Sequence, residues 1–176
     1  MKEKTLYLHR QYVEEVDALI RSLEVLDRPL LHRKPKNGGW SAMQVLYHLV
    51  LVEENSIAYL RKKLSFKPEL PKSGIGAAFR SLLLNISLQL PGLKFKAPKA
   101  AASDRIPEQG DLAEIQERWL KTCADWRDFL EQMPDLLPEK ALYRHPRAGM
   151  LNLDQTIRFL QGHFRRHRRQ IMRSLK

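Results

Sequence analysis

The sequence predicts an all-α protein in which four long helices form an antiparallel bundle. Three observations support this fold class: apolar residues recur at helical spacing in four long segments, capping patterns open two of them, and prolines separate them. No segment alternates apolar and polar residues with a period of two, so we expect no β-strands. Residues 1–176 are expected to form a single domain, because this length suits one hydrophobic core.

The first half of the chain contains two of these helices. The first runs over about residues 2–27, and Pro29 is expected to end it. After a turn-rich stretch, KPKNGGW, the second helix runs over about residues 41–64. It opens with an S-x-x-Q pattern, in which Ser41 and Gln44 can each accept a hydrogen bond from the other's backbone N–H.

The second half contains the other two helices. The third spans about residues 111–133, and Pro134 ends it. Its apolar stripe includes Cys123, which we expect to be a small buried packing residue because no base motif accompanies it. The last helix begins at Asn152 in an N-x-x-Q pattern, with Asp154 in the first turn, where the helix dipole favours an acid.

Residues 65–110 interrupt the helical pattern between the second and third helices. Prolines punctuate this insert, and only GAAFRSLLLNISLQL, residues 76–90, is predicted to form a short extra helix. A long irregular connection in a small domain is often functional and is otherwise a mobile linker. We assign no chemical role to this insert from its sequence.

Composition and charge limit the setting and the partners of the protein. The formal net charge of +11 favours anionic partners without choosing among nucleic acid, membrane surface and small acids. A single cysteine excludes an internal disulfide and fits a reducing compartment. We expect no signal peptide and no membrane-spanning segment, and therefore a cytoplasmic location, because charges interrupt every apolar run.

Two histidines stand four positions apart in the stretch GHFRRHRRQI, residues 162–171. At about 100° per helical residue, His163 and His167 fall on the flank of the apolar stripe, whereas the arginines occupy a separate face that we expect to be mainly solvated. Residues i and i+4 lie one turn apart, so both imidazoles could reach one metal ion. Two ligands alone do not make a stable site.

His48 is the candidate for a third ligand. It lies on the apolar side of the second helix, in SAMQVLYHLVLVEEN. A hydrogen-bonded structural histidine is the usual reason for an imidazole in a core, and the spacing leaves both interpretations open. His9 and His32 belong to no such pattern, and we expect them at the surface.

Two stretches, GGWSAMQVLYHL and YRHPRAGMLNLDQTIRFLQGHFRRHRRQI, resemble the DinB-like family, whose relatives include the bacillithiol transferases and the mycothiol-dependent maleylpyruvate isomerases. The resemblance implies an up-down-down-up bundle of four helices that binds a divalent metal, with zinc or nickel as the expected ion. The family's three histidine ligands fall on His48, His163 and His167. The resemblance also implies a homodimer, since family members are often dimers.

One position departs from the pattern of this family. The acid often found just after the first histidine of the H-x-x-x-H helix is Phe164 here. We therefore expect no proton-handling role at this position, while the three implied ligands are unaffected.

Four further residues are candidates for the pocket, and each has a simpler structural explanation. Gln44 could hydrogen-bond a metal-bound water, although its capping role already explains it. Asn55 and Tyr59 lie on the same face of the second helix as His48, so both could line the pocket. Asn55 could instead be a solvated polar residue, and Tyr59 could be a core aromatic. His145, in the H-P turn, could approach the site, although a hydrogen bond that stabilises the turn explains it equally well.

Three functions are compatible with these features. The first is a metal-dependent transferase, in which a low-molecular-weight thiol attacks an electrophilic small molecule; known activities in the resembled family tend towards such thiol chemistry. The second is a metal-dependent hydrolase, because an ion with an open coordination position can also activate water. For the transferase, a basic pocket rim that includes Lys94, Lys96 and Lys99 is expected to attract the carboxylates that such thiols usually carry.

The third function is a non-enzymatic nucleic-acid-binding protein, which the positive charge suggests. Against nucleic acid as a partner, the arginine face lacks interleaved aromatic residues, and no known binding motif is present.

Overall fold

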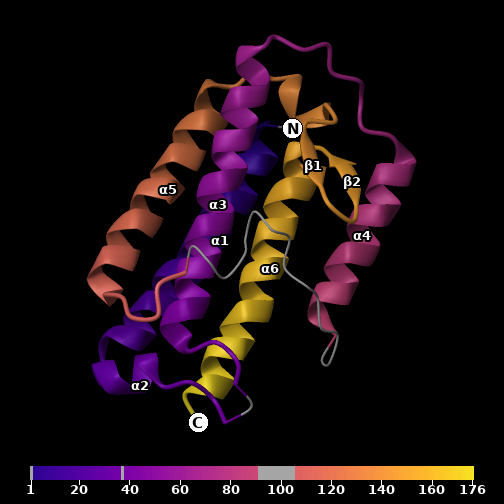
Figure 1. Cartoon of the computed structure of the whole chain (residues 1–176). Coiled ribbons are helices and arrows are strands. Elements are labelled where there is room, and N and C mark those ends of the chain that lie inside the picture. Colours follow the sequence, from indigo (N-terminus) through magenta and orange to yellow (C-terminus); the bar gives the residue numbers. More distant parts are fainter. Residues whose placement is uncertain (1, 37, 91–105) are drawn as a thin grey trace.

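Four long helices form the predicted bundle in the structure, a computed structural model that describes residues 2–36, 38–90 and 106–176. They are α1 (Lys2–Glu24), α3 (Ala42–Ser65), α5 (Leu112–Gln132) and α6 (Leu153–Ser174). In Figure 1, α1 and α6 run downward, whereas α3 and α5 run upward, which is the up-down-down-up order. Both α1 and α3 pack against α5 and α6, so α1 and α3 occupy opposite corners. The predicted fold class is confirmed.

Shorter elements connect these helices. They are α2 (Arg28–His32), α4 (Ile75–Gln89), the 3-10 helix η3 (Leu137–Glu139), β1 (Tyr143–His145) and β2 (Gly149–Leu151). The helix α4 confirms the short extra helix predicted within residues 65–110, and it packs along α6 and β2. The expected basic rim, Lys94, Lys96 and Lys99, lies outside the described residues. None of the described helices is long and apolar enough to span a membrane.

Two expectations about the elements are wrong. Strands were not expected, yet β1 and β2 form an antiparallel hairpin in which Tyr143 pairs with Leu151 and His145 with Gly149. Each strand has three residues, which is too short for a period of two to register in the sequence. Pro29 does not end the first helix, which stops at Glu24; it lies in the first turn of α2, where its missing N–H leaves no helical hydrogen bond unmade.

The helix caps agree with the sequence patterns. At the start of α3, the Ser41 N–H donates to Gln44 Oε1 at 3.1 Å, and the Gln44 N–H donates to Ser41 Oγ at 3.2 Å. The same reciprocal pair joins Asn152 and Gln155 at the start of α6. These caps fix where α3 and α6 begin, and therefore which faces they turn towards each other.

The bundle interior contains two packed clusters. In the cluster nearer α2, Phe164 is fully buried and meets Tyr12 and Trp119 edge-on, with ring centroids 5.6 and 5.8 Å away. A core aromatic thus occupies the position where the resembled family often has an acid. Cys123 is buried in the same cluster, and burial raises the pKa of its thiol well above the usual range, which confirms its packing role.

His9 does not lie at the surface, as we expected from the sequence. It is buried in α1 because it shares a helical face with Tyr12 and Val16, and burial, assisted by Arg127, lowers its pKa to about 4. His32, in α2, is half-buried. The sequence does contain a signal for the burial of His9, because His9 lies three residues before Tyr12 and seven before Val16, both core positions.

A buried carboxyl group lies between α1, α3 and α5. Glu53 Oε1 accepts hydrogen bonds from the Tyr12 hydroxyl and from Trp119 Nε1, while Glu53 Oε2 is buried without a hydrogen-bond partner among the described residues. Burial raises the pKa of Glu53 from 4.5 to about 8, although the two hydrogen bonds act in the opposite direction. Glu53 is therefore a neutral acid of the core at neutral pH.

This carboxyl group predicts how stability depends on pH. Because the pKa of Glu53 is higher in the folded protein, the folded state binds more protons than the unfolded chain between pH 4.5 and about 8. The stability that Glu53 contributes is full below that range and is lost as the pH rises through it. Glu53→Gln mimics the neutral acid, so its unfolding free energy relative to wild type should rise steadily from pH 5 to about 8 in urea titrations. A difference independent of pH would show that Glu53 is ionised in the fold.

Candidate metal centre

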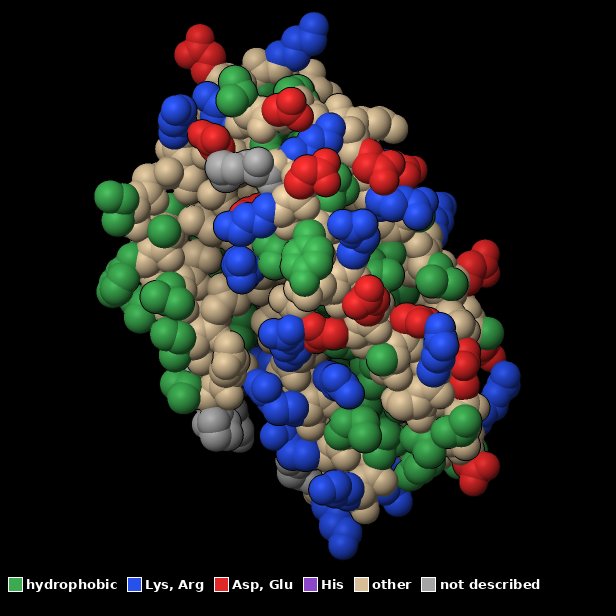
Figure 2. Space-filling view, turned by 180° about the vertical axis from the view of Figure 1, so that it is seen from behind, with side chains coloured by type: hydrophobic (Ala, Val, Ile, Leu, Met, Phe, Trp, Pro, Cys, Tyr) green, Lys and Arg blue, Asp and Glu red, His purple; other side chains and the backbone are tan. Residues whose placement is uncertain are grey.

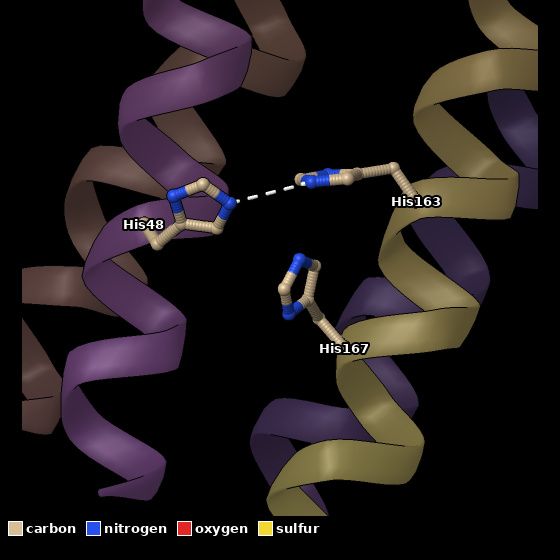
Figure 3. A group of neighbouring side chains, drawn as sticks. All are labelled: His48, His163 and His167. Atoms are coloured by element: carbon tan, nitrogen blue, oxygen red, sulfur yellow. Dashed lines mark hydrogen bonds between the residues drawn. The ribbon is translucent and has the colours of Figure 1, made fainter. Parts of the chain in front are cut away.

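Three histidines from two helices converge on one point. α3 provides His48, α6 provides His163 and His167, and one ring nitrogen from each lies within 4.8 Å of the others. His48 Nε2 is 3.3 Å from His163 Nε2. Figure 3 shows the three rings turned into the space between α3 and α6. The structure thus brings together the three residues that the sequence singled out.

The local sequence explains why these rings face one another. His163 and His167 are one turn apart on α6, so their side chains leave the same face of that helix. The cap at Ser41 sets the start of α3, and its packing against α6 turns His48 towards the pair. Gly162, beside His163, lets α4 approach α6 closely, since a Cβ there would lie 2.8 Å from Asn85 Oδ1.

The separation of one pair of these nitrogens matches that of two ligands on a divalent ion. Two imidazole nitrogens that bind one tetrahedral zinc ion at about 2.0–2.1 Å lie about 3.3 Å apart. His48 Nε2 and His163 Nε2 have this separation. Among the described residues, the cluster contains no carboxylate or thiol, so its donor set is three nitrogens. Such a set leaves a fourth tetrahedral position for another ligand.

Two imidazoles of the cluster, His163 and His167, are held in the neutral form that binds metal. Burial and the neighbouring His167, His48 and His145 lower the pKa of His163 well below its usual range. Burial, with His48 as the next cause, lowers the pKa of His167 to about 3, although a hydrogen bond to Gln170 opposes the shift. Neutral imidazoles need not lose a proton before they bind an ion.

Several neighbours that sequence reasoning missed hold or flank the three rings. His167 Nδ1 lies 2.9 Å from Gln170 Oε1, which assigns the proton of that ring to Nδ1 and leaves Nε2 for the cluster. Trp40 lies 5.1 Å from His48 between ring centroids, and Phe159 lies 5.7 Å from His163. The contact of Gln170 with His167 could have been predicted, because Gln170 lies about one helical turn after His167. No separate sequence pattern indicated that Trp40 and Phe159 flank the rings.

The four predicted pocket residues occupy different places. Gln44 is buried and uses its carboxamide oxygen in the cap of α3. Asn55 is exposed on α3. Tyr59 is also exposed and packs edge-on against Tyr143, with centroids 5.7 Å apart.

His145 is buried close to the cluster but serves the hairpin turn. Its Nδ1 accepts hydrogen bonds from the backbone N–H of Arg147 at 3.2 Å and of Ala148 at 3.1 Å. Its ring packs edge-on against Phe159, which in turn contacts His163. Burial, assisted by Arg147, lowers the pKa of His145 to about 4. The turn-stabilising role expected from the sequence is present.

The arginines of α6 are less free than the sequence suggested. Arg165 Nε donates to Glu15 Oε2 at 2.8 Å, and its Nη2 reaches Glu15 Oε1 at 2.5 Å. Arg169 donates to the carbonyl of Leu88 at 3.1 Å, near the end of α4. These contacts tie α6 to α1 and α4. The arginines therefore form a separate face of α6, as predicted, but some of them bind neighbouring helices instead of being fully solvated.

The sequence matches the model of the DinB superfamily over residues 11–171, and the chain belongs to this superfamily. Among solved structures, the chain is similar to YfiT from Bacillus subtilis, described as a probable metal-dependent hydrolase with an unusual four-helix bundle topology. The likeness covers 98% of this chain and 85% of that chain, with a TM-score of 0.60 and 18% sequence identity, and it concerns the fold. No curated protein matches the sequence.

Variants of His145 should separate turn stability from metal binding. His145→Ala leaves two backbone N–H groups of the turn without their acceptor, which should lower stability by about 1–3 kcal/mol in thermal or urea unfolding. His145→Asn keeps an acceptor at a similar position and should recover most of this loss. Metal content, measured by mass spectrometry, should match wild type in both. A well-folded His145→Asn that lost its metal would place His145 among the ligands.

Proposed function

We propose that His48, His163 and His167 together bind one divalent metal ion, zinc or nickel, and that the protein is a metal-dependent enzyme. The observation that carries this proposal is the convergence of three imidazoles whose ring nitrogens lie within 4.8 Å of one another, with one pair, His48 and His163, at the 3.3 Å spacing of tetrahedral ligands. Such an ion supplies a strong positive charge that lowers the pKa of a bound thiol or water at its open position.

The preferred reaction is the transfer of a low-molecular-weight thiol to an electrophilic small molecule. Three neutral donors leave the double positive charge of an ion uncompensated, which favours an anionic fourth ligand such as a thiolate. His163 and His167 are only half-buried, so a small ligand can approach them from solvent. Low-molecular-weight thiols commonly carry carboxylates, and the net charge of +11 favours their approach.

The surrounding residues have distinct proposed tasks. Gln170 orients His167 through its Nδ1, so that Nε2 faces the ion. Trp40 and Phe159 flank the cluster with apolar rings and limit the access of bulk water. Gln44, Asn55 and Tyr59 stay candidates for contacts with substrate at the edge of this site.

The second candidate function is metal-dependent hydrolysis. It is favoured by the description of YfiT, which shares this bundle, as a probable metal-dependent hydrolase. The same three-histidine site would serve it, with water in place of thiol as the nucleophile. Nucleic-acid binding has less support, because Arg165 and Arg169 already have partners within the protein.

Metal content should identify the ligands. Protein purified without a chelator or a nickel column should carry about one ion per chain, as a single three-histidine site requires. His48→Ala, His163→Ala and His167→Ala should each lose most of this metal while far-ultraviolet circular dichroism stays helical. His32→Ala, a half-buried histidine outside the cluster, is the matched control and should retain it.

A variant with weakened metal binding provides a second test of the ligand assignment. Gln170→Ala should still load at high metal concentration, but its affinity should fall by about 10–100-fold, because His167 loses its orienting partner. Full metal occupancy in all three alanine variants of the cluster would overturn the ligand assignment.

Cobalt(II) substitution should distinguish thiol transfer from hydrolysis. Addition of a small thiol to the cobalt form should produce a near-ultraviolet charge-transfer band that saturates, because a thiolate donates charge to the ion. The band should be absent from His163→Ala. A spectrum that ignores thiols but changes with pH near neutrality would instead favour the hydrolase.

A further inference from the structure

A hollow on the outer side of α6 is lined mainly by arginines. Its volume is about 470 Å³. In Figure 2, Lys and Arg side chains form a band over the lower half of the molecule, where α6 ends, whereas Asp and Glu side chains lie among them elsewhere on this face. The lining residues, called the arginine hollow from here on, are Glu15 of α1 and Arg165, Arg168, Arg169, Met172 and Arg173 of α6.

The arginine hollow is separate from the histidine cluster. His163 and His167 turn towards His48 of α3, whereas Glu15 of α1 lines the hollow. At about 100° per helical residue, Met172 lies on nearly the opposite side of α6 from His163. A ligand in the hollow therefore does not depend on the proposed metal chemistry.

Two arginines of the hollow are held in place by neighbouring helices. Arg165 donates two hydrogen bonds to Glu15, and Arg169 donates to the Leu88 carbonyl at the end of α4. Although burial raises the pKa of Glu15, hydrogen bonds from Arg165 and Gln161 lower it, so this carboxylate is ionised. A guanidinium has five N–H donors, and both arginines therefore keep donors for a ligand.

The hollow concentrates positive charge. Its four arginines and one glutamate leave a net charge of +3. Arg165, Arg169 and Arg173 follow one another at intervals of four residues, and like charges at this spacing destabilise a helix. Burial, and then the charges of Arg169 and Arg173, also lower the pKa of the neighbouring Arg166. An anion bound among these guanidiniums would offset their repulsion.

The charge and the donors of the hollow fit a phosphate group better than a carboxylate. A phosphate monoester carries a charge of about −1.5 to −2 at pH 7 and three acceptor oxygens, so it can accept hydrogen bonds from several guanidiniums at once. A carboxylate has one charge and two oxygens. The basic residues of α6 are all arginines, whose planar donor fork matches phosphate, and α6 contains no lysine.

The shape of the hollow favours a small molecule over an extended polyanion. Its volume lies within the range of about 300–1,000 Å³ that is typical of small-molecule sites. The arginines from Arg165 to Arg173 span only about 12 Å along α6. Among the described residues, no aromatic ring lines the hollow for a base to stack on. Met172, which is 46% exposed, instead offers an apolar surface to the carbon atoms of an organic phosphate.

We propose that the arginine hollow binds a small phosphorylated molecule, whose phosphate accepts hydrogen bonds from Arg168 and Arg173. The remaining donors of Arg165 and Arg169 complete its surroundings, so that the ligand ties α6 to α1 and α4. Binding stabilises the folded protein, because the unfolded chain has no such hollow. Loss of Arg168 and Arg173 relieves the repulsion without ligand but removes this stabilisation.

Isothermal titration calorimetry of the full-length protein with fructose 1,6-bisphosphate, in about 150 mM NaCl, tests this proposal. Wild type should bind with a Kd below about 1 mM, and Arg168→Gln/Arg173→Gln should bind at least about tenfold more weakly. Without ligand, this double variant should be at least as stable as wild type in urea unfolding.

Two control variants accompany this titration. Arg10→Gln/Arg158→Gln loses the same charge at exposed positions outside the hollow and should bind like wild type. His163→Ala should also bind like wild type, because the histidine cluster lies on the other side of α6. Loss of binding in His163→Ala alone would place the sugar phosphate at the metal site and overturn the proposal.

Three other results would overturn it. The first is equal affinity for succinate at matched ionic strength, because the hollow would then select charge and not phosphate. The second is a double variant, Arg168→Gln/Arg173→Gln, that binds as tightly as wild type, or no more weakly than Arg10→Gln/Arg158→Gln. The third is a wild type that does not bind the sugar phosphate; binding of a DNA duplex, lost in the double variant, would then assign the hollow to nucleic acid.

Discussion

The packing of α3 against α6 is the contact on which the site depends. It brings one histidine of α3 to the two histidines of α6, so that the His48 and His163 nitrogens lie 3.3 Å apart. Each helix starts at a reciprocal cap, at Ser41 and at Asn152, and these caps fix the helical phase of the three histidines. Buried aromatic residues such as Phe164 and Trp119 then hold the helices at a constant separation.

Burial and mutual repulsion oppose protonation of His163 and His167, and this favours the proposed metal ion over protons as the occupant of the cluster. Burial lowers the pKa of His163 and His167, and a proton on one ring raises the cost of a proton on the next. An ion that binds to the folded cluster and not to the unfolded chain adds its binding free energy to the stability of the fold. Metal binding at the proposed site would thus be linked to the packing of α3 on α6.

Helical periodicity was sufficient to predict the long helices, and local capping patterns predicted where α3 and α6 begin. Spacing placed the three histidines on inward faces, but only the resemblance to the DinB-like family grouped them as one ligand set. The hairpin was missed, since three-residue strands leave no periodic signal and are held by pairing and by the turn around His145. His9 was misplaced because its core position depends on the whole face of α1. Trp40 and Phe159 approach the cluster only through tertiary packing. The outer face of α4 has the same apolar pattern as a core helix, so the exposure of Ile75, Phe79 and Leu82 became visible only in the folded chain.

X-ray absorption spectroscopy of the zinc-loaded protein tests the central claim most directly, because it reports the atoms bound to the ion. The predicted spectrum contains three imidazole nitrogens at about 2.0–2.1 Å, with the outer-ring scattering of histidine, and one further ligand. On addition of a small thiol, that ligand should become a sulfur at about 2.3 Å. A first shell of carboxylate and water oxygens without imidazole scattering would contradict the site at His48, His163 and His167.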